Sequence, residues 1–171
     1  VPTAMAGLLI REWAEAIFGM PRLVAGMLLV TAALLVTARL AESKSDSPRR
    51  IGIGHALLIG LVQGIAIVPG ISRSGSTIAV ALLLGLGREE AARFSFLLAV
   101  PAILGALLIE ILQEGLGGGV ALWPLVIGFA TAGVLGLAAL AIVVPLVRSG
   151  CLHYFAVYLV PVGMIGWVTL P

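Results

Sequence analysis

Long apolar runs, separated by short polar segments, constrain this chain more than any other feature. The stretch from Arg22 to Leu40 holds some 19 residues, of which only Arg22 and Arg39 are charged. A helix of that length can cross the hydrocarbon core of a bilayer. Over the whole chain 61% of residues are hydrophobic, 11% are charged, and the mean hydropathy is +1.20. These values exclude an ordinary soluble domain.

The order of these runs predicts an all-α integral membrane protein, a polytopic helix bundle that forms a single domain. The chain opens on Val1-Pro2 within an apolar run, so we expect it to be a fragment of a longer protein. The expected elements are spans at 20–40, 91–112, 122–147 and 152–170, a hydrophilic linker at 41–50 and a helix hairpin at 51–86.

The hairpin is predicted from the segment that Pro69-Gly70 interrupts. Proline removes a backbone donor and biases the preceding residue away from helix. A helix from Ser74 to Leu86, capped by Ser74 or Ser72, would have about 13 residues and be roughly 20 Å long, too short for a core of about 30 Å. We therefore expect a re-entrant helix hairpin with its tip buried in protein or facing water. Two tilted spans joined by an external loop are the alternative.

Basic residues mark the ends of the expected spans. If the hairpin returns to its starting side, seven of them share one face of the membrane: Arg39, Lys44, Arg49, Arg50, Arg88, Arg93 and Arg148. Arg11 and Arg22 flank the opposite face. The positive-inside rule then places residues 41–50 in the cytoplasm. With a net charge of only +2, this placement indicates topology and gives no reason to expect a nucleic-acid partner.

The hairpin tip carries the candidate chemistry. Residues 69–77 read Pro-Gly-Ile-Ser-Arg-Ser-Gly-Ser-Thr, so an arginine and four hydroxyls lie inside an apolar stretch. An arginine at mid-membrane costs roughly 2.5–3.5 kcal/mol on insertion scales and is a functional candidate for that reason. Glycine and serine leave backbone N–H groups open, a helix start adds a positive dipole end, and Arg73 offers a planar fork. Together these features predict a phosphate cradle.

Other polar residues leave the chemistry incomplete. Gln63 needs a hydrogen-bond partner, which could be the tip or a neighbouring helix. His55, His153 and Cys151 are too scattered to form a zinc site. No carboxylate or histidine stands near the tip in sequence to act as nucleophile or general base, so the cradle supplies only part of a hydrolytic site.

Two strings carry a resemblance to a known family. They are Gln63-Gly64 followed by residues 69–77, and the segment Arg93-Phe94-Ser95-Phe96-Leu97-Leu98-Ala99-Val100-Pro101. They closely resemble the undecaprenyl-pyrophosphate phosphatases, also called the bacitracin-resistance (BacA/UppP) proteins. The resemblance implies a multi-pass enzyme of the bacterial inner (plasma) membrane that converts undecaprenyl diphosphate to undecaprenyl phosphate, recycling the lipid carrier for cell-wall synthesis. It also implies an inverted-repeat architecture of which this chain is one half.

The same resemblance implies roles for individual residues. Arg73 would clamp the diphosphate, while Ser72, Ser74 and Thr77 would donate hydrogen bonds to its oxygens. We therefore predict a catalytic set of Arg73, Ser72 and Ser74, and a substrate-binding set of Gly70, Gly75, Ser76, Thr77 and Gln63.

A divalent metal, Mg²⁺ or Ca²⁺, is also implied by the resemblance, with its ligands in an N-terminal repeat that carries a glutamate-rich motif. Here Gln63 and Ile67 stand where that repeat has its paired glutamates. We therefore expect no metal ligand in this chain, and no activity from the chain alone. The alternative function is a transporter or flippase half-domain that binds an anionic substrate and releases it unchanged. A purely structural bundle would leave Arg73 unexplained. The oligomeric state, a homodimer included, stays open.

Overall fold

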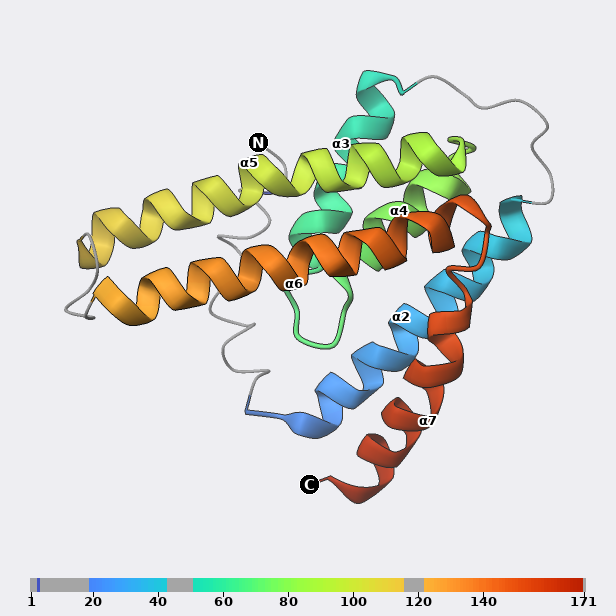
Figure 1. The fold of residues 1–171 in the computed structure, drawn as a ribbon. Coiled ribbons are helices and arrows are strands. Elements are labelled where there is room, and N and C mark those ends of the chain that lie inside the picture. The colour runs from blue at the N-terminus through green and yellow to red at the C-terminus, as the bar shows by residue number, and fades with distance from the viewer. Residues whose placement is uncertain (1–2, 4–18, 43–50, 116–121, 171) are drawn as a thin grey trace.

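The structure of the protein is a computed structural model that describes residue 3 and residues 19–42, 51–115 and 122–170. Its helices in these ranges are α2 (Pro21–Glu42), α3 (Ile53–Ile65), α4 (Arg73–Leu83), α5 (Arg88–Glu114), α6 (Leu122–Arg148) and α7 (Tyr154–Thr169) (Figure 1). No strand occurs among the described residues. The predicted all-α class is therefore confirmed.

Three of these helices are long and apolar enough to cross a membrane. The qualifying stretches are Pro21–Arg39 with 19 residues, Arg88–Gln113 with 26 and Leu122–Arg148 with 27. The apolar helices α3 and α7 are shorter, with 13 and 16 residues. This pattern of long and short apolar helices is that of a polytopic membrane protein.

The short helix α4 lies at the centre of the packing. It packs against α2, α3 and α5. Seven of its 11 residues are buried, because small residues alternate with branched ones and allow neighbours to approach on several sides. Its buried apolar residues are Ile78, Ala79, Ala81 and Leu82, and they form one core with Leu35, Ala38, Ile59, Leu86, Ala91, Ala92, Val147 and Leu152.

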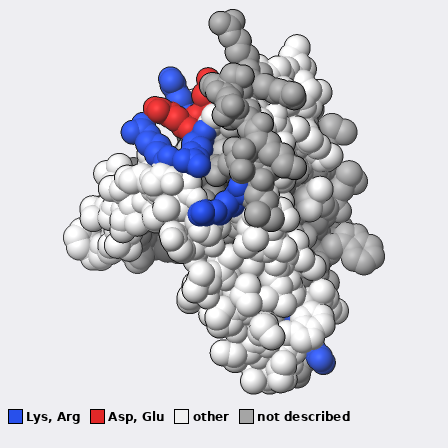
Figure 2. All heavy atoms as spheres, turned by 90° about the vertical axis from the view of Figure 1, so that its right-hand side faces the viewer, with Lys and Arg blue, Asp and Glu red and all other residues white. Residues whose placement is uncertain are grey.

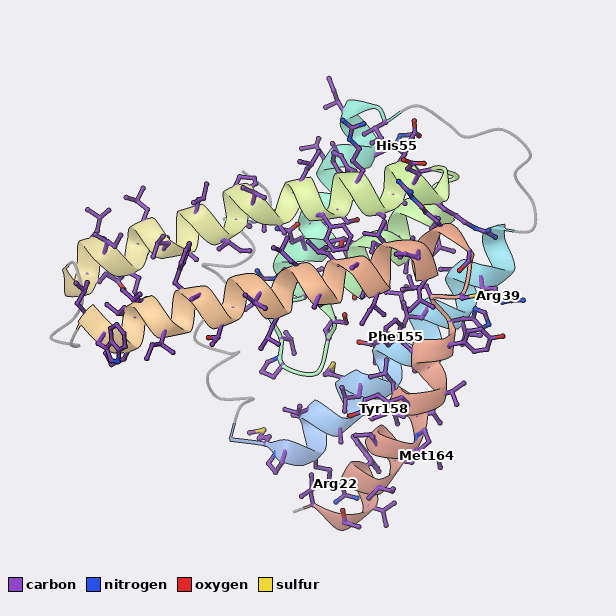
Figure 3. The ribbon with its side chains drawn as sticks, in the orientation of Figure 1. Arg22, Arg39, His55, Phe155, Tyr158 and Met164 are labelled. Atoms are coloured by element: carbon purple, nitrogen blue, oxygen red, sulfur yellow. The ribbon has the colours of Figure 1, made fainter. Side chains whose placement is uncertain are left out.

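Helices α2 and α7 lie side by side and make the most extensive helix pair (Figure 1). Small residues bring the two backbones close together: a Cβ built on Gly163 would meet Ala25 O at 3.0 Å. At one end of the pair the guanidinium of Arg22 lies 5.3 Å from the centre of the Trp167 ring. Figure 3 shows Arg22 and Arg39 at opposite ends of α2. The pair therefore forms a closely packed support on one side of the hairpin.

Helices α5 and α6 form an antiparallel pair that extends away from α2 and α7 (Figure 1). Most of their apolar side chains are exposed, and in α6 the buried residue is Val147. Exposed apolar helix surface of this extent fits a lipid environment rather than water.

Charged side chains gather where α5 begins and α6 ends. Arg148 Nη2 lies 2.8 Å from Glu89 Oε1, and Arg88 Nη1 donates to Arg148 O at 3.4 Å. Nearby, Arg39 Nη1 lies 2.7 Å from His153 Nε2, which brings the end of α2 to the same place. Figure 2 shows this charged end of the molecule. Lys44, Arg49 and Arg50, which we expected on the same face, lie outside the described residues.

Candidate functional site

The link between α3 and α4 makes the tight turn that Pro69-Gly70 predicted. Helix α3 ends at Ile65 and α4 begins at Arg73, so the second arm has 11 residues rather than the expected 13 or so. Gly70 has a φ of +89°, in the left-handed region that glycine adopts readily. The chain reverses here, and α4 packs back along α3.

The tip of this hairpin lies against the N-terminal half of α2. A Cβ built on Gly70 would meet Met27 Cβ at 2.8 Å and would also collide with Val24 O. The position therefore requires glycine twice, once for its backbone conformation and once for its close approach to α2.

One hydroxyl of α2 connects to both sides of residue 71. Thr31 Oγ1 accepts a hydrogen bond from Ser72 N–H at 3.1 Å and lies 3.1 Å from both Gly70 O and Met27 O, either of which can take its proton. Thr31 is buried, with 1% of its surface exposed. The sequence alone did not predict that Thr31 lies at this site. The available signal was a threonine in the middle of an apolar span.

The first turn of α4 is capped by Ser72. Its Oγ accepts a hydrogen bond from Gly75 N–H at 3.1 Å, and its carbonyl accepts one from Ser76 N–H at 2.8 Å. Of the two caps that the sequence left open, Ser72 rather than Ser74 takes this position. Because the Ser72 oxygen acts as acceptor here, its hydroxyl proton stays available for a ligand.

The predicted site residues separate into an outward and an inward group. Arg73 and Ser74 are exposed at the start of α4, whereas Gly75, Ser76 and Thr77 are buried. Thr77 Oγ1 lies 3.0 Å from Arg73 O and 3.2 Å from Ser74 O, so its proton is directed at its own helix. The Ser76 hydroxyl is buried and has no hydrogen-bond partner among the described residues. In this arrangement the outward group can meet a ligand directly.

Gln63 connects α3 to α5. Its Nε2 donates to Leu98 O at 3.3 Å, and its side chain is buried. The sequence left two hydrogen-bond partners open for Gln63, the tip and a neighbouring helix, and in the structure the partner is the neighbouring helix α5. This hydrogen bond joins the two strings that carried the family resemblance, because Leu98 belongs to the segment 93–101.

The exposed start of α4 is electropositive. It carries the guanidinium of Arg73 and the N–H groups of a helix N-terminus, and its first turn contains no acidic residue. Within the described part of the chain, Arg73 forms no ion pair with a carboxylate. Such a helix start favours an anion, phosphate in particular.

The described residues do not form a metal site. Among them, no three His, Cys, Asp or Glu residues come close enough together to hold an ion. The two histidines have other contacts: His55 Nδ1 accepts from Gly52 N–H at 3.2 Å, and His153 lies beside Arg39. This donor set does not fit a divalent cation, so we assign it no step that uses a metal.

Comparison with known families places the chain. Residues 1–165 match the family model described as Bacitracin resistance protein BacA. The chain belongs to the BacA family. This assignment confirms the resemblance drawn from the tip and from segment 93–101, and with the three long apolar helices it makes the chain a multi-pass membrane protein.

Several relatives of this BacA chain are named undecaprenyl-diphosphatase. The relative from Desulfatibacillum aliphaticivorans is 42% identical over 95% of this chain and 59% of its own length. The one from Rhodopirellula baltica is 40% identical over 96% of this chain and 65% of its own length. The chain thus spans about three fifths of these relatives. A shorter relative, from Methanothermobacter thermautotrophicus, is 41% identical and is covered over 92% of its length.

Proposed function

We propose that this BacA chain supplies the phosphate-binding part of an undecaprenyl-diphosphate phosphatase. The observation that carries the proposal is the start of α4, where the exposed Arg73 and Ser74 lie at a capped helix N-terminus without an acidic partner in the described part of the chain. The names of the relatives support this substrate. The reaction would convert undecaprenyl diphosphate and water to undecaprenyl phosphate and inorganic phosphate.

The groups at the tip suit the electrostatic part of that reaction. Water attacks the terminal phosphorus, and the bond from that phosphorus to the bridging oxygen breaks. Negative charge then shifts toward the bridging oxygen, which leaves as part of undecaprenyl phosphate. Arg73 would hold two phosphate oxygens through its planar fork, and the Ser72 and Ser74 hydroxyls would donate to the same group. Donors fixed in place before reaction stabilise such charge most effectively. The proton that water loses would pass to a base that we do not assign to a described residue.

The lengths of the hairpin helices support a location inside the membrane. Helix α3 has 13 residues and α4 has 11. At 1.5 Å per residue these helices are roughly 20 Å and 17 Å long, against a hydrocarbon core of about 30 Å. We propose that the pair is re-entrant, that its tip brings the α4 N-terminus to the diphosphate below the headgroups, and that the membrane is the bacterial inner membrane. A divalent metal cofactor would be held by residues other than those described.

The test is hydrolysis by a full-length protein that contains this chain, reconstituted in lipid vesicles with undecaprenyl diphosphate. We expect release of inorganic phosphate, together with formation of undecaprenyl phosphate in equal amount. Saturable binding of the lipid with no phosphate release would instead support the transporter or flippase reading.

A further inference from the structure

We propose that Thr31 is a positioning residue for the anion site at the start of α4. Its hydroxyl would fix the backbone on both sides of residue 71, and so fix the direction in which the Arg73 side chain points from α4. The role in hydrolysis rests on the proposed function, whereas the role in holding the tip does not.

The contacts of Thr31 join parts of the chain that are distant in sequence. Ser72, whose N–H donates to Thr31 Oγ1 at 3.1 Å, lies 41 residues further along the chain. Gly70, whose carbonyl lies at the same distance, is 39 residues further along. The side chain is 1% exposed, so neither contact is exchanged readily for water. The turn is therefore attached to α2 through one oxygen, which accepts from Ser72 N–H and can donate its proton to Gly70 O.

Helix α2 is itself held on another side, which makes Thr31 a fixed point. Gly163 of α7 comes so close to α2 that an added Cβ would meet the Leu29 side chain at 2.7 Å and Ala25 O at 3.0 Å. The hairpin tip contacts α2 at Val24 and Met27. Through Thr31, the position of the hairpin tip thus depends on the position of the α2–α7 pair.

The hydrogen bond to Ser72 N–H lies one residue from Arg73. Ser72 is also the N-cap, and its Oγ accepts from Gly75 N–H. Loss of the Thr31 hydroxyl would leave Ser72 N–H without its acceptor and free the turn to shift, and the cap and the guanidinium would shift with it. Electrostatic donors lose most of their effect when they must reorganise during the reaction.

The experiment compares Thr31→Val with Thr31→Ser in the full-length protein in lipid vesicles. Valine keeps the branched shape and removes the hydroxyl, and serine restores the hydroxyl. Thr37→Val is the matched control, because Thr37 lies on the same helix, is exposed, and directs its hydroxyl at Leu34 O of its own helix at 2.9 Å. Two quantities are measured: amide hydrogen exchange of peptides covering residues 66–77, and phosphate release from undecaprenyl diphosphate.

We expect Thr31→Val to speed exchange of the turn amides about tenfold and to lower phosphate release about tenfold, on the scale of one lost buried hydrogen bond. Thr31→Ser should stay within about twofold of wild type in both, and Thr37→Val should match wild type. Faster exchange confined to residues 66–77 would support a positioning role for Thr31. Faster exchange that also spreads over α2 and α7 would show a general loss of stability and would overturn that role.

The remaining outcomes separate this inference from the proposed function. Unchanged exchange in Thr31→Val would overturn the inference even if Arg73→Ala abolishes hydrolysis. Faster exchange with wild-type phosphate release would overturn the role of Thr31 at the anion site, because the tip would then move without any effect on hydrolysis. If the wild-type protein releases no phosphate, the proposed function fails, and binding of inorganic pyrophosphate by Thr31→Val and wild type decides the role of Thr31. Weaker binding in Thr31→Val supports that role, and equal binding overturns it.

Discussion

The indole ring of Trp167 lies directly over Gly26, where an added Cβ would meet Trp167 Cζ3 at 2.7 Å. Only a residue without a side chain allows α7 to come this close to α2. Arg22, one turn earlier on α2, covers the same ring with its guanidinium. The contact explains why a glycine is needed inside an apolar helix, where it otherwise lowers helix stability.

Gly26→Val is therefore expected to force α2 and α7 apart. We predict that it lowers the free energy of unfolding by about 1–3 kcal/mol, the scale of overpacking in a dense core. Gly128→Val is the matched control, because Gly128 lies in α6 and an added Cβ there meets nothing within 4 Å. Thermal unfolding in detergent, followed by circular dichroism, provides the comparison. Equal midpoints for the two variants would contradict the close packing of Trp167 on Gly26.

Gly70→Ala tests how closely the hairpin tip approaches α2. Both Gly70 and Gly115 have positive φ, +89° and +80°, but an added Cβ at Gly115 meets nothing within 4 Å. Gly115 has a ψ of 173°, an extended conformation at positive φ that only glycine adopts readily, so Gly115→Ala should cost only the backbone penalty, about 1–3 kcal/mol. Gly70→Ala adds the collision with Val24 O and Met27 to its own backbone penalty. We expect Gly70→Ala to unfold at a clearly lower temperature than Gly115→Ala. If the two variants are equally stable, the tip does not contact α2 in the folded protein.

Arg73 is expected to be the most sensitive residue of the tip. In the full-length protein, Arg73→Ala should lower the rate of phosphate release by about 10²–10³, the effect of one preorganised electrostatic donor. Arg73→Lys should fall between Ala and wild type, because it keeps the charge but loses the fork. Arg148→Ala, which removes an exposed arginine paired with Glu89, is the control and should leave the rate near wild type. Wild-type turnover by a folded Arg73→Ala protein would remove the central claim of the proposed function.

The chain of 171 residues is expected to release no phosphate by itself. Under the proposed function it offers the phosphate clamp Arg73, but its tip has no carboxylate or histidine nearby in sequence for the proton transfer. Co-expression with the N-terminal half of a longer BacA relative should restore activity, measured as phosphate release from purified membranes. The relative from Methanothermobacter thermautotrophicus, which this chain covers over 92% of its length, is also named undecaprenyl-diphosphatase. Phosphate release by the purified chain would therefore contradict this prediction and would place the general base within these 171 residues.

If the hairpin is re-entrant, as we propose, the linker 41–50 and the start of α5 lie on one side of the membrane. Cysteines introduced as Ser47→Cys and Arg88→Cys, with Cys151 replaced by serine, should react with an impermeant thiol reagent from the same face of oriented vesicles. A cysteine in place of Ser74 should react only with small reagents. Labelling of positions 47 and 88 from opposite faces would support two full spans instead.

Local chemistry predicted much of the hairpin, and long-range packing decided the rest. Pro69-Gly70 predicted the break, because proline and glycine act on their own backbone. Ser72 was one of two predicted caps, and only the geometry of the turn selects it. The role of Thr31 could not be predicted, because its partners lie 39 and 41 residues away and depend on how α2 meets the tip.

The inward residues of the site show the same limit. We expected Thr77 to donate to a phosphate, and in the structure its hydroxyl is directed at Arg73 O and Ser74 O. A threonine in a helix often donates its hydroxyl proton to the carbonyl three or four residues earlier. The sequence was therefore compatible with a hydroxyl that donates to a phosphate and with one that donates to its own helix. Gln63 was likewise open between two partners until the position of Leu98 was known.

The absence of a carboxylate beside Arg73 in the described residues has a consequence for how a ligand arrives. An arginine that is paired with a carboxylate of its own protein must first break that ion pair, and this step slows the binding of an incoming anion. Arg73 is exposed, so an incoming anion meets water and loosely held counter-ions rather than a carboxylate of the described residues. Under the proposed function, capture of the lipid diphosphate does not wait for an internal ion pair to open, and chloride or sulfate in the surrounding solution should compete for the same place.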